Sequence, residues 1–239
     1  NGQQPFSLPW QGRQATIAYN GELYNAPELR RDLEALGFSF STRCDTEVAL
    51  AAYLAWGLDC PRRFNGIFAL AVDDPAAGRA FLCRDPFGVK PLFYTLREGR
   101  LVFASEIKAL FEYPGVRPVV GKEGLREIFG LGPARTPGCG VFEGIRELKP
   151  GHLAIFDRQG FRELAYFDLE AQPLELSYPQ AVEQVRDLLT DAVRRQLKSD
   201  VPLCTFLSGG LDSSLVTAIA AKSLGELGEK LDTYSFEFE

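Results

Sequence analysis

The sequence predicts a layered, antiparallel α+β domain followed by the beginning of an α/β domain with a parallel sheet. Two observations carry this prediction. Residues 13–167 contain many short strand patterns and hairpin turns, interrupted by a few helical segments. From residue 177 onwards, a long amphipathic helix precedes an apolar strand, a glycine turn and a second helix, which is the order of a β-α-β unit. We place the two domains at 1–172 and 173–239.

Local patterns locate strands and helices in the first domain. The strands are expected at 80–84, 92–96, 101–104, 153–156 and 162–167, and the helices at 27–36 and 46–56. The first helix begins at Pro27 and ends before Gly37, which are the usual positions of proline and glycine at helix ends. Residues 130–140, rich in glycine and proline, give the clearest loop of the chain.

The second domain begins with a helix whose start is marked by a capping box, Ser177 followed three residues later by Gln180. Apolar residues then recur at helical spacing and form one face: Val182, Val185, Leu188, Leu189, Ala192, Val193 and Leu197. A strand over 203–207, a helix over 215–222 that ends near Gly225, and a strand over 231–238 complete the expected unit.

Between that strand and the next helix runs Ser-Gly-Gly-Leu-Asp-Ser-Ser, residues 208–214. A glycine turn between a buried strand and a helix N-terminus directs free backbone N–H groups at one point, which is a geometry that binds phosphate. Gly209 and Gly210 allow close approach of the backbone, while Asp212 can cap the helix or hold a magnesium ion. The alternative is an ordinary Gly-Ser turn that caps a core helix.

The run lacks the lysine of a Walker A loop, and it resembles the PP-loop of the ATP pyrophosphatases, which cleave ATP to AMP and pyrophosphate. The resemblance implies that ATP and magnesium are bound here, with Asp212 holding the metal together with pyrophosphate. The implied ATP-binding residues are Leu207, Ser208, Gly209, Gly210, Asp212, Ser213, Ser214 and Phe236.

Further motifs lie upstream, at residues 19–25, 42–48, 64–70, 84–94 and 103–110. Taken alone, Asn20-Gly21 is a turn dipeptide of a hairpin or a strand end. In this order, however, the segments resemble the glutaminase half of the glutamine-dependent asparagine synthetases, a class II amidotransferase of the N-terminal-nucleophile hydrolase type. The phosphate loop then falls where the synthetase domain of that family begins.

The resemblance assigns roles to four residues of the first domain. Asn20 and Gly21 match the oxyanion hole, in which a side-chain amide and a backbone N–H stabilise the anion formed when a thiolate attacks the carboxamide of glutamine. Glu22 and Asp45 match the positions that hold the α-ammonium group of glutamine. Asp45 also precedes an apolar helix, so that it can be an N-cap as well.

The chain departs from the family at both ends. The nucleophile of a class II amidotransferase is an N-terminal cysteine whose α-amine serves as the base, whereas this chain starts with Asn1. Residues 2–5 resemble a segment inside the glutaminase domain, after the nucleophile and an arginine that grips the glutamine carboxylate, and residues 233–239 resemble the second strand of the synthetase domain. We therefore expect an internal piece of a longer protein that is inactive by itself, since no cysteine lies near its start.

Composition restricts the partners and the compartment. A net charge of -6 and a pI near 5.1 argue against nucleic acid and anionic membranes as partners. Five cysteines without a C-x-x-C spacing fit reduced thiols in the cytoplasm. The single histidine, His152, cannot form a histidine-based zinc site. No apolar run approaches the ~20 residues of a membrane span.

The resemblance implies an ATP-dependent ligase that transfers ammonia from glutamine to β-aspartyl-AMP and yields asparagine, AMP and pyrophosphate. Glutamine, ATP and aspartate are the implied partners, and a homodimeric assembly stays open. Two alternatives remain. One is a paralogous amidotransferase that acts on another carboxylate, of a cell-wall or polysaccharide component. The other is a glutaminase-dead homologue that resembles the β-lactam synthetases, although the retained glutamine pocket argues against it.

Overall fold

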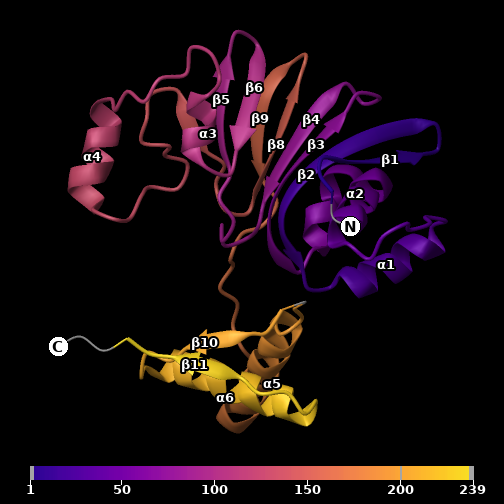
Figure 1. Ribbon diagram of the computed structural model, residues 1–239, viewed down its shortest axis with the longest axis vertical. Coiled ribbons are helices and arrows are strands. Elements are labelled where there is room, and N and C mark those ends of the chain that lie inside the picture. Colours follow the sequence, from indigo (N-terminus) through magenta and orange to yellow (C-terminus); the bar gives the residue numbers. More distant parts are fainter. Residues whose placement is uncertain (1–2, 200, 237–239) are drawn as a thin grey trace. The chain divides into compact units, whose positions relative to one another are not determined.

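The computed structural model describes residues 3–199 and 201–236 (Figure 1). The chain divides into two units, Asn1–Glu170 and Ala171–Glu239, and each has its own sheet. The first unit holds the antiparallel sheets, and the second holds a parallel pair of strands. The predicted fold class, a layered α+β domain followed by the start of an α/β domain, is therefore confirmed.

The centre of the first unit is an antiparallel sheet, here called the main sheet, with the strand order β1-β2-β3-β4-β8-β9. Its strands are β1 (Phe6–Trp10), β2 (Arg13–Leu23), β3 (Gly66–Asp74), β4 (Arg79–Arg84), β8 (His152–Asp157) and β9 (Gly160–Ala165). In β2, Ala15, Ile17, Tyr19 and Leu23 are buried, and the residues between them are more exposed. This alternation places one face of the strand against the core.

Two helices cover that face of the main sheet (Figure 1). Helix α1 (Ala26–Ala35) buries Leu29 and Leu33, which are four residues apart and lie on the same side. Helix α2 (Asp45–Trp56) is apolar around most of its circumference and is almost entirely buried. A helix of that composition is stable only inside the protein, so α2 forms the centre of the largest core. The 3-10 helix η1 (Gly57–Arg63) follows it.

A second antiparallel sheet, the small sheet, packs on the opposite face of the main sheet. It has the order β6-β5-β7, with β5 (Phe93–Arg97), β6 (Arg100–Ala104) and β7 (Ile145–Glu147). Leu92 and Tyr94 meet Ala69 and Leu82 of the main sheet in a separate apolar cluster. Helix α3 (Ile107–Phe111) covers the small sheet through Leu110, while α4 (Lys122–Leu131) lies in the connection to β7. The first unit is thus layered as helices, main sheet and small sheet.

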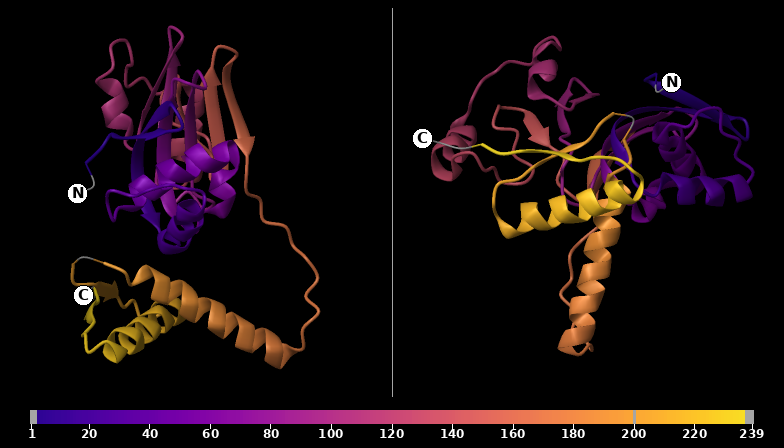
Figure 2. Two further views of the ribbon diagram at one scale, coloured as in Figure 1. Left: turned by 90° about the vertical axis from the view of Figure 1, so that its right-hand side faces the viewer. Right: turned by 60° about the horizontal axis from the view of Figure 1, so that its bottom comes forward.

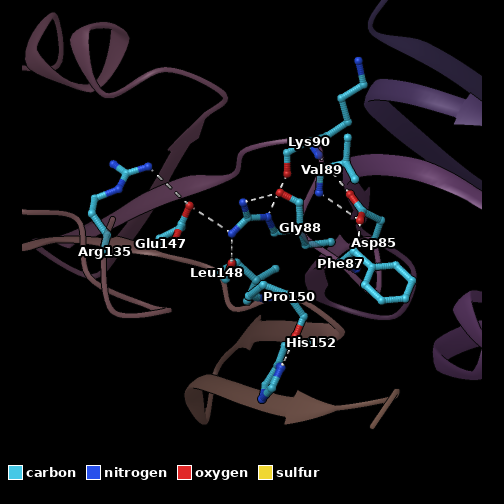
Figure 3. Close-up of polar contacts among 11 residues, drawn as sticks. Asp85, Phe87, Gly88, Val89, Lys90, Arg135, Glu147, Leu148, Pro150 and His152 are labelled. Carbon is cyan, nitrogen blue, oxygen red and sulfur yellow. Dashed lines mark hydrogen bonds and ion pairs between the residues drawn. The ribbon is translucent and has the colours of Figure 1, made fainter. Parts of the chain in front are cut away.

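The carboxylate of Asp85 organises the turn that leads from the main sheet to the small sheet (Figure 3). Asp85 is 1% exposed. Its carboxylate accepts hydrogen bonds from the backbone N–H groups of Phe68, Phe87, Val89 and Lys90, at 3.0–3.3 Å. Four N–H donors compensate one buried negative charge, so the turn and β3 are held by a single side chain.

The neighbouring Arg84 binds the carbonyl oxygens around the turn, as Asp85 binds its N–H groups. Its guanidinium, buried beside the turn, donates to the carbonyl oxygens of Gly88, Lys90 and Leu148 at 2.7–2.8 Å. It also forms an ion pair of 3.0 Å with Glu147 of β7. Because Arg84 ends β4, these contacts connect the main sheet with the small sheet (Figure 3).

A second buried carboxylate, that of Glu47, fixes the segment in front of α2. Its two oxygens accept the backbone N–H and the hydroxyl groups of Ser41 and Thr42 at 2.6–2.9 Å. Burial alone raises the pKa of this carboxyl group, but the hydrogen bonds from Ser41 and Thr42 outweigh it and hold the pKa below its ordinary value of 4.5. Glu47 therefore anchors the loop that delivers Asp45 to the start of the helix.

The second unit is built from two helices and a pair of parallel strands (Figure 2). Its elements are α5 (Tyr178–Gln196), β10 (Cys204–Phe206), α6 (Leu211–Glu226) and β11 (Asp232–Tyr234). The two helices pack together, and Arg194 of α5 pairs with Glu226 of α6 at 3.1 Å. The capping box of Ser177 and Gln180 is present at the start of α5.

Most elements expected from local patterns are confirmed to within about four residues, and the differences have physical reasons. The expected loop over 130–140 begins inside α4, which was not predicted because Gly124 and Gly130 lower its helix propensity. Helix α6 starts at Leu211 instead of residue 215, since its first turn contains the polar residues of the phosphate loop. Strand β11 is shorter than the expected strand over 231–238, of which residues 237 and 238 lie outside the described residues.

We expect Asp85→Asn to lower the free energy of unfolding by about 3 kcal/mol, because it replaces a charged acceptor with an amide group that faces N–H donors. Urea unfolding measures the loss. The matched control is Asp73→Asn, since Asp73 is exposed on neighbouring β3. Equal stability of the two variants would show that the carboxylate does not hold the turn.

We expect Glu47→Gln to lower the free energy of unfolding by about 2 kcal/mol at neutral pH. The pKa of Glu47 is lowered in the folded chain, so its contribution is complete above the ordinary pKa of 4.5 and is lost as the pH falls through the folded-state pKa. The difference between the wild type and the variant should therefore shrink on acidification. Unfolding curves from pH 7 downwards test this, with exposed Glu34→Gln as the control. A difference that is independent of pH would contradict it.

Candidate functional site

Asn20 and Gly21 lie inside strand β2, so the expectation of a turn or strand end at this dipeptide is wrong. Gly21 faces Phe68 of β3, and the two backbones approach closely there. A Cβ atom at Gly21 would come within 2.3 Å of the carbonyl oxygen of Ile67. No side chain fits in that space. The close approach of β2 to β3, and not a turn, therefore explains the glycine at position 21.

The N–H of Gly21 points away from β3, towards the open edge of β2. The N–H and C=O groups of Phe68 are bonded to Asp85 on the opposite side, so Gly21 and Phe68 form a non-hydrogen-bonded pair. Two residues further along, the N–H of Leu23 also points to this edge and donates to Asp45 at 3.0 Å. Strand β1 pairs with β2 only as far as Ile17. The Gly21 N–H is therefore presented as a donor at an uncovered edge.

The side chain of Asn20 is exposed and faces the small sheet. Its Nδ2 donates to Oγ of Ser105, which follows β6, at 3.3 Å. Both residues line a cleft of about 240 Å³, whose walls also include Leu92 and Phe103. Asn20 and Gly21 thus supply a side-chain amide and a backbone N–H from consecutive positions, which are the donors that an oxyanion hole requires.

Asp45 joins the start of α2 to this edge of β2. Its Oδ2 accepts the hydroxyl of Tyr19 at 2.9 Å in addition to the N–H of Leu23, while Oδ1 lies 3.6 Å from Sγ of Cys44. The N-cap of α2 is Cys44, so the prediction that Asp45 caps the helix is wrong. A carboxylate offers about four acceptor positions, and Asp45 therefore keeps capacity for an ammonium group.

Glu22 is exposed on β2, and its charge acts on the same region as Asp45. The pKa of the Tyr19 hydroxyl is raised strongly, first by burial, then by the charge of Asp45 and its hydrogen bond, and also by the charge of Glu22. Tyr19 therefore remains a protonated donor to Asp45. The charges of both carboxylates thus raise the pKa of the same hydroxyl.

The internal cysteines divide by exposure. Cys60 and Cys83 are buried, and burial raises the pKa of both thiols well above the ordinary value of 9.0. A neutral, inaccessible thiol is a poor nucleophile, so these two are structural. Cys44 and Cys139 are half-buried, and Cys204 is exposed. The lone His152 bonds through Nδ1 to the carbonyl oxygen of Pro150 at 2.8 Å (Figure 3), a structural contact.

The predicted phosphate loop connects β10 to α6. Gly209 has a φ of +82°, a left-handed conformation that L-residues adopt only with strain. Ser208 and Ser213 bond to each other through their hydroxyl oxygens at 2.9 Å, and Ser213 also donates to the carbonyl oxygen of Gly210 at 3.2 Å. These contacts close the loop over the first turn of α6, whose N–H groups have no acceptor within the helix.

Gly210 is the N-cap of α6 and makes no side-chain cap, so the expectation that Asp212 caps the helix is wrong. Asp212 instead lies exposed in the first turn. No group of three or more His, Cys, Asp or Glu side chains that could hold a metal ion occurs among the described residues. An exposed carboxylate beside a phosphate-binding turn nevertheless suits a magnesium ion that is shared with phosphate oxygens.

Leu207 and Phe236 lie at the carboxyl ends of the two parallel strands. The N–H of Leu207 donates to the carbonyl oxygen of Tyr234 at 2.8 Å, and the hydroxyl of Ser235 donates to the carbonyl oxygen of Leu207 at 2.6 Å. The Phe236 ring is 79% exposed and stacks on Phe206, with 5.9 Å between ring centroids. An aromatic pair therefore stands at the edge where parallel sheets bind nucleotides.

Sequence reasoning missed three residues that shape the two sites: Tyr19, Ser105 and Ser235. Tyr19 and Ser105 belong to motif segments that were recognised, but nothing in their local pattern reveals contacts across 26 and 85 residues. These contacts can be identified only once the pairing of the strands is known. Within the described residues, no helix has the length and apolar character needed to cross a membrane.

Two family models match different stretches of this chain. Residues 1–167 match a family model described as a glutamine amidotransferase domain, and residues 184–239 match one described as asparagine synthase. Among solved structures, the glutamine phosphoribosylpyrophosphate amidotransferase from B. subtilis aligns with 97% of this chain and 48% of its own, with a TM-score of 0.49 and 19% sequence identity.

Curated relatives extend the likeness over the whole sequence. The glutamine-hydrolyzing asparagine synthetase 3 of Bacillus subtilis is 48% identical over 239 residues, which are 100% of this chain and 39% of that protein. The glutamine-hydrolyzing asparagine synthetase 1 of the same strain is 34% identical and is matched over 37% of its length. The chain therefore spans about two fifths of these relatives. It belongs to the glutamine amidotransferase domain family, and its C-terminal residues match the asparagine synthase family.

Proposed function

We propose that the protein containing these residues is an ATP-dependent, glutamine-hydrolysing amide ligase. Glutamine and water give glutamate and ammonia in the first unit. Aspartate and ATP give β-aspartyl-AMP and pyrophosphate in the second, and ammonia then displaces AMP to form asparagine. The observation that supports the proposal is that one chain combines an open edge of β2, with the amide donors of Asn20 and Gly21, and a glycine-serine turn before α6.

In the glutaminase reaction, Asn20 and Gly21 donate to the oxygen that becomes negative when the carboxamide of glutamine is attacked. Asp45 and Glu22 hold the α-ammonium group of the same molecule: Asp45 is bonded to this edge through the N–H of Leu23, and Glu22 follows Gly21 on β2. We propose no nucleophile among the internal cysteines, since Cys60 and Cys83 are buried and an internal cysteine has no free α-amine to serve as its base.

In the synthetase reaction, the N–H groups of the first turn of α6 and the hydroxyl groups of Ser208, Ser213 and Ser214 bind the leaving pyrophosphate. Asp212 would hold magnesium together with that pyrophosphate, and the metal would neutralise the charge that develops on it. Leu207 and Phe236 flank the adenosine. This role suits their position at the strand ends, where the exposed ring of Phe236 can stack on a base.

Aspartate is the acceptor that we propose, with glutamine as the ammonia donor and a cytoplasmic location. The test is incubation of the full-length gene product with glutamine, ATP, magnesium and aspartate. Formation of asparagine, glutamate, AMP and pyrophosphate in equal amounts supports the proposal. Cleavage of ATP that requires a different carboxylate would favour the paralogous amidotransferase, and ATP cleavage without any use of glutamine would favour the β-lactam-synthetase-like alternative.

For the oxyanion hole, we expect Asn20→Ala in the full-length protein to slow glutamine-dependent synthesis on the order of 10²- to 10³-fold, about 3–4 kcal/mol of transition-state stabilisation. Synthesis from free ammonia should be largely retained, because ammonia bypasses the glutaminase site. Steady-state rates with each nitrogen donor measure both effects.

The matched control for this variant is Asn65→Ala, since Asn65 is exposed at the neighbouring strand and makes its hydrogen bonds through the backbone. It should leave both rates unchanged. If Asn20→Ala lowers the rates with ammonia and with glutamine equally, the variant has a folding defect. That result would contradict the role of Asn20 in the oxyanion hole.

For the phosphate loop, we expect Gly209→Val to abolish adenylylation while glutamine hydrolysis survives, because the valine strains the turn and blocks approach of the phosphate. Gly228→Val is the matched control: Gly228 follows α6 at its other end, also has a positive φ, and also has open space around its Cβ position. Both variants should lose about 1–2 kcal/mol of stability. Pyrophosphate release by Gly209→Val at the parental rate would contradict the role of the loop.

A further inference from the structure

The β1–β2 ladder stops just before the oxyanion-hole residues. Backbone pairing runs from Trp10 and Arg13 to Phe6 and Ile17. Continued by two residues, the same register would pair Tyr19 with residue 4, but Pro5 intervenes and has no N–H to donate. The edge of β2 would therefore be left without a partner at the residue that precedes Asn20.

The side chain of Gln4 occupies that place. Its Oε1 accepts the backbone N–H of Tyr19 at 2.6 Å, and its Nε2 donates to the carbonyl oxygen of Tyr19 at 2.8 Å. A primary amide that both accepts from and donates to one residue reproduces the pair of bonds that a neighbouring strand would make. The ladder is thus extended by a side chain, at the end nearest the candidate oxyanion hole.

Three successive N–H groups at the open edge of β2 then differ in their partners. The N–H of Tyr19 is bonded to Gln4, and the N–H of Leu23 is bonded to Asp45 at 3.0 Å. Gly21 lies between them with its N–H presented to the edge. The Gly21 donor is therefore fixed from both sides, by Gln4 before it and by Asp45 after it.

Gln4 also belongs to the cleft that holds the second donor. It lines the space of about 240 Å³ together with Asn20 and Ser105. Nδ2 of the Asn20 carboxamide donates there to Oγ of Ser105 at 3.3 Å. This one hydrogen bond orients the carboxamide as long as the backbone of β2 stays in place. Gln4 is thus in a position to stabilise the backbone from which both donors project.

We propose that Gln4 is a positioning residue of the glutaminase site, which holds β2 so that the Gly21 N–H and the Asn20 carboxamide meet the developing oxyanion together. This inference rests on the proposed function and deepens it. Gln4 is an exposed residue, and its two side-chain hydrogen bonds are to the backbone of Tyr19. Its loss should therefore affect the geometry of the edge far more than the stability of the fold.

The first test compares Gln4→Met with Gln14→Met in the full-length protein. Methionine keeps the length of the side chain and removes both hydrogen bonds, and Gln14 is an exposed residue of β2. We expect Gln4→Met to lower kcat for glutamine hydrolysis on the order of 10- to 100-fold. KM for glutamine should stay nearly constant because Asp45 and Glu22 remain, and ammonia-dependent synthesis should be unchanged. Gln14→Met should behave as the wild type.

The second test is the pH profile of Gln4→Glu. A glutamate anion can accept the N–H of Tyr19 but opposes its carbonyl oxygen, whereas the protonated acid can accept and donate as glutamine does. The kcat of Gln4→Glu relative to the wild type should therefore rise as the pH is lowered towards the usual glutamate pKa of about 4.3. The ratio for Gln4→Met should not change with pH.

The outcomes separate this inference from the function on which it rests. If the wild type releases no glutamate from glutamine, the proposed function is wrong. If the wild type is active and Gln4→Met equals Gln14→Met in kcat, Gln4 does not position the site. Equal losses of glutamine- and ammonia-dependent activity, accompanied by a lowered unfolding midpoint, would assign Gln4 to the stability of the fold and would also overturn the inference.

Discussion

The carboxylate of Asp85 is the constraint on which the arrangement of the first unit depends. It occupies the N–H groups of the turn and of Phe68, and Arg84 beside it binds the carbonyl oxygens of the same turn and pairs with Glu147. These two buried charges are compensated by the backbone of both sheets, so neither sheet can shift without leaving a charge unsatisfied. Because Phe68 is bonded to Asp85, its backbone is turned away from β2. That orientation leaves Gly21 with its N–H pointing outwards.

The candidate glutaminase site follows from this arrangement by short steps. Gly21 can approach β3 only because it has no Cβ, and its N–H is presented to the open edge because Phe68 is already engaged. Asp45 reaches that edge because Glu47 anchors the preceding loop. The two buried carboxylates, Asp85 and Glu47, have no part in the proposed chemistry. They nevertheless determine where the donors and the ammonium partner lie.

The sequence allowed most elements and the strand-turn-helix order around residues 208–214 to be predicted, but not the geometry of the candidate glutaminase site. The predicted phosphate loop is encoded locally: seven of its eight assigned residues lie within 207–214, and a strand and a helix flank them. Asn20-Gly21 was open to interpretation as a turn, because this dipeptide prefers turns locally. The contact that requires a glycine at position 21 is with the carbonyl oxygen of Ile67, 46 residues away. The partners of Asp45 and Asn20 are likewise distant in sequence, so only strand register reveals them.

This difference in locality predicts different sensitivities of the two sites. The phosphate loop depends on one β-α junction, closed by contacts among Ser208, Gly210 and Ser213, and on the bonds of Leu207 to the neighbouring residues Tyr234 and Ser235. The edge of β2 depends at once on pairing with β3, on Gln4 before β1, on Asp45 of α2 and on Ser105 after β6. Substitutions scattered through the first unit should therefore impair glutamine hydrolysis more often than substitutions in the second impair ATP cleavage. Under the proposed function, ammonia-dependent synthesis is then the activity that is retained when the first unit is disturbed.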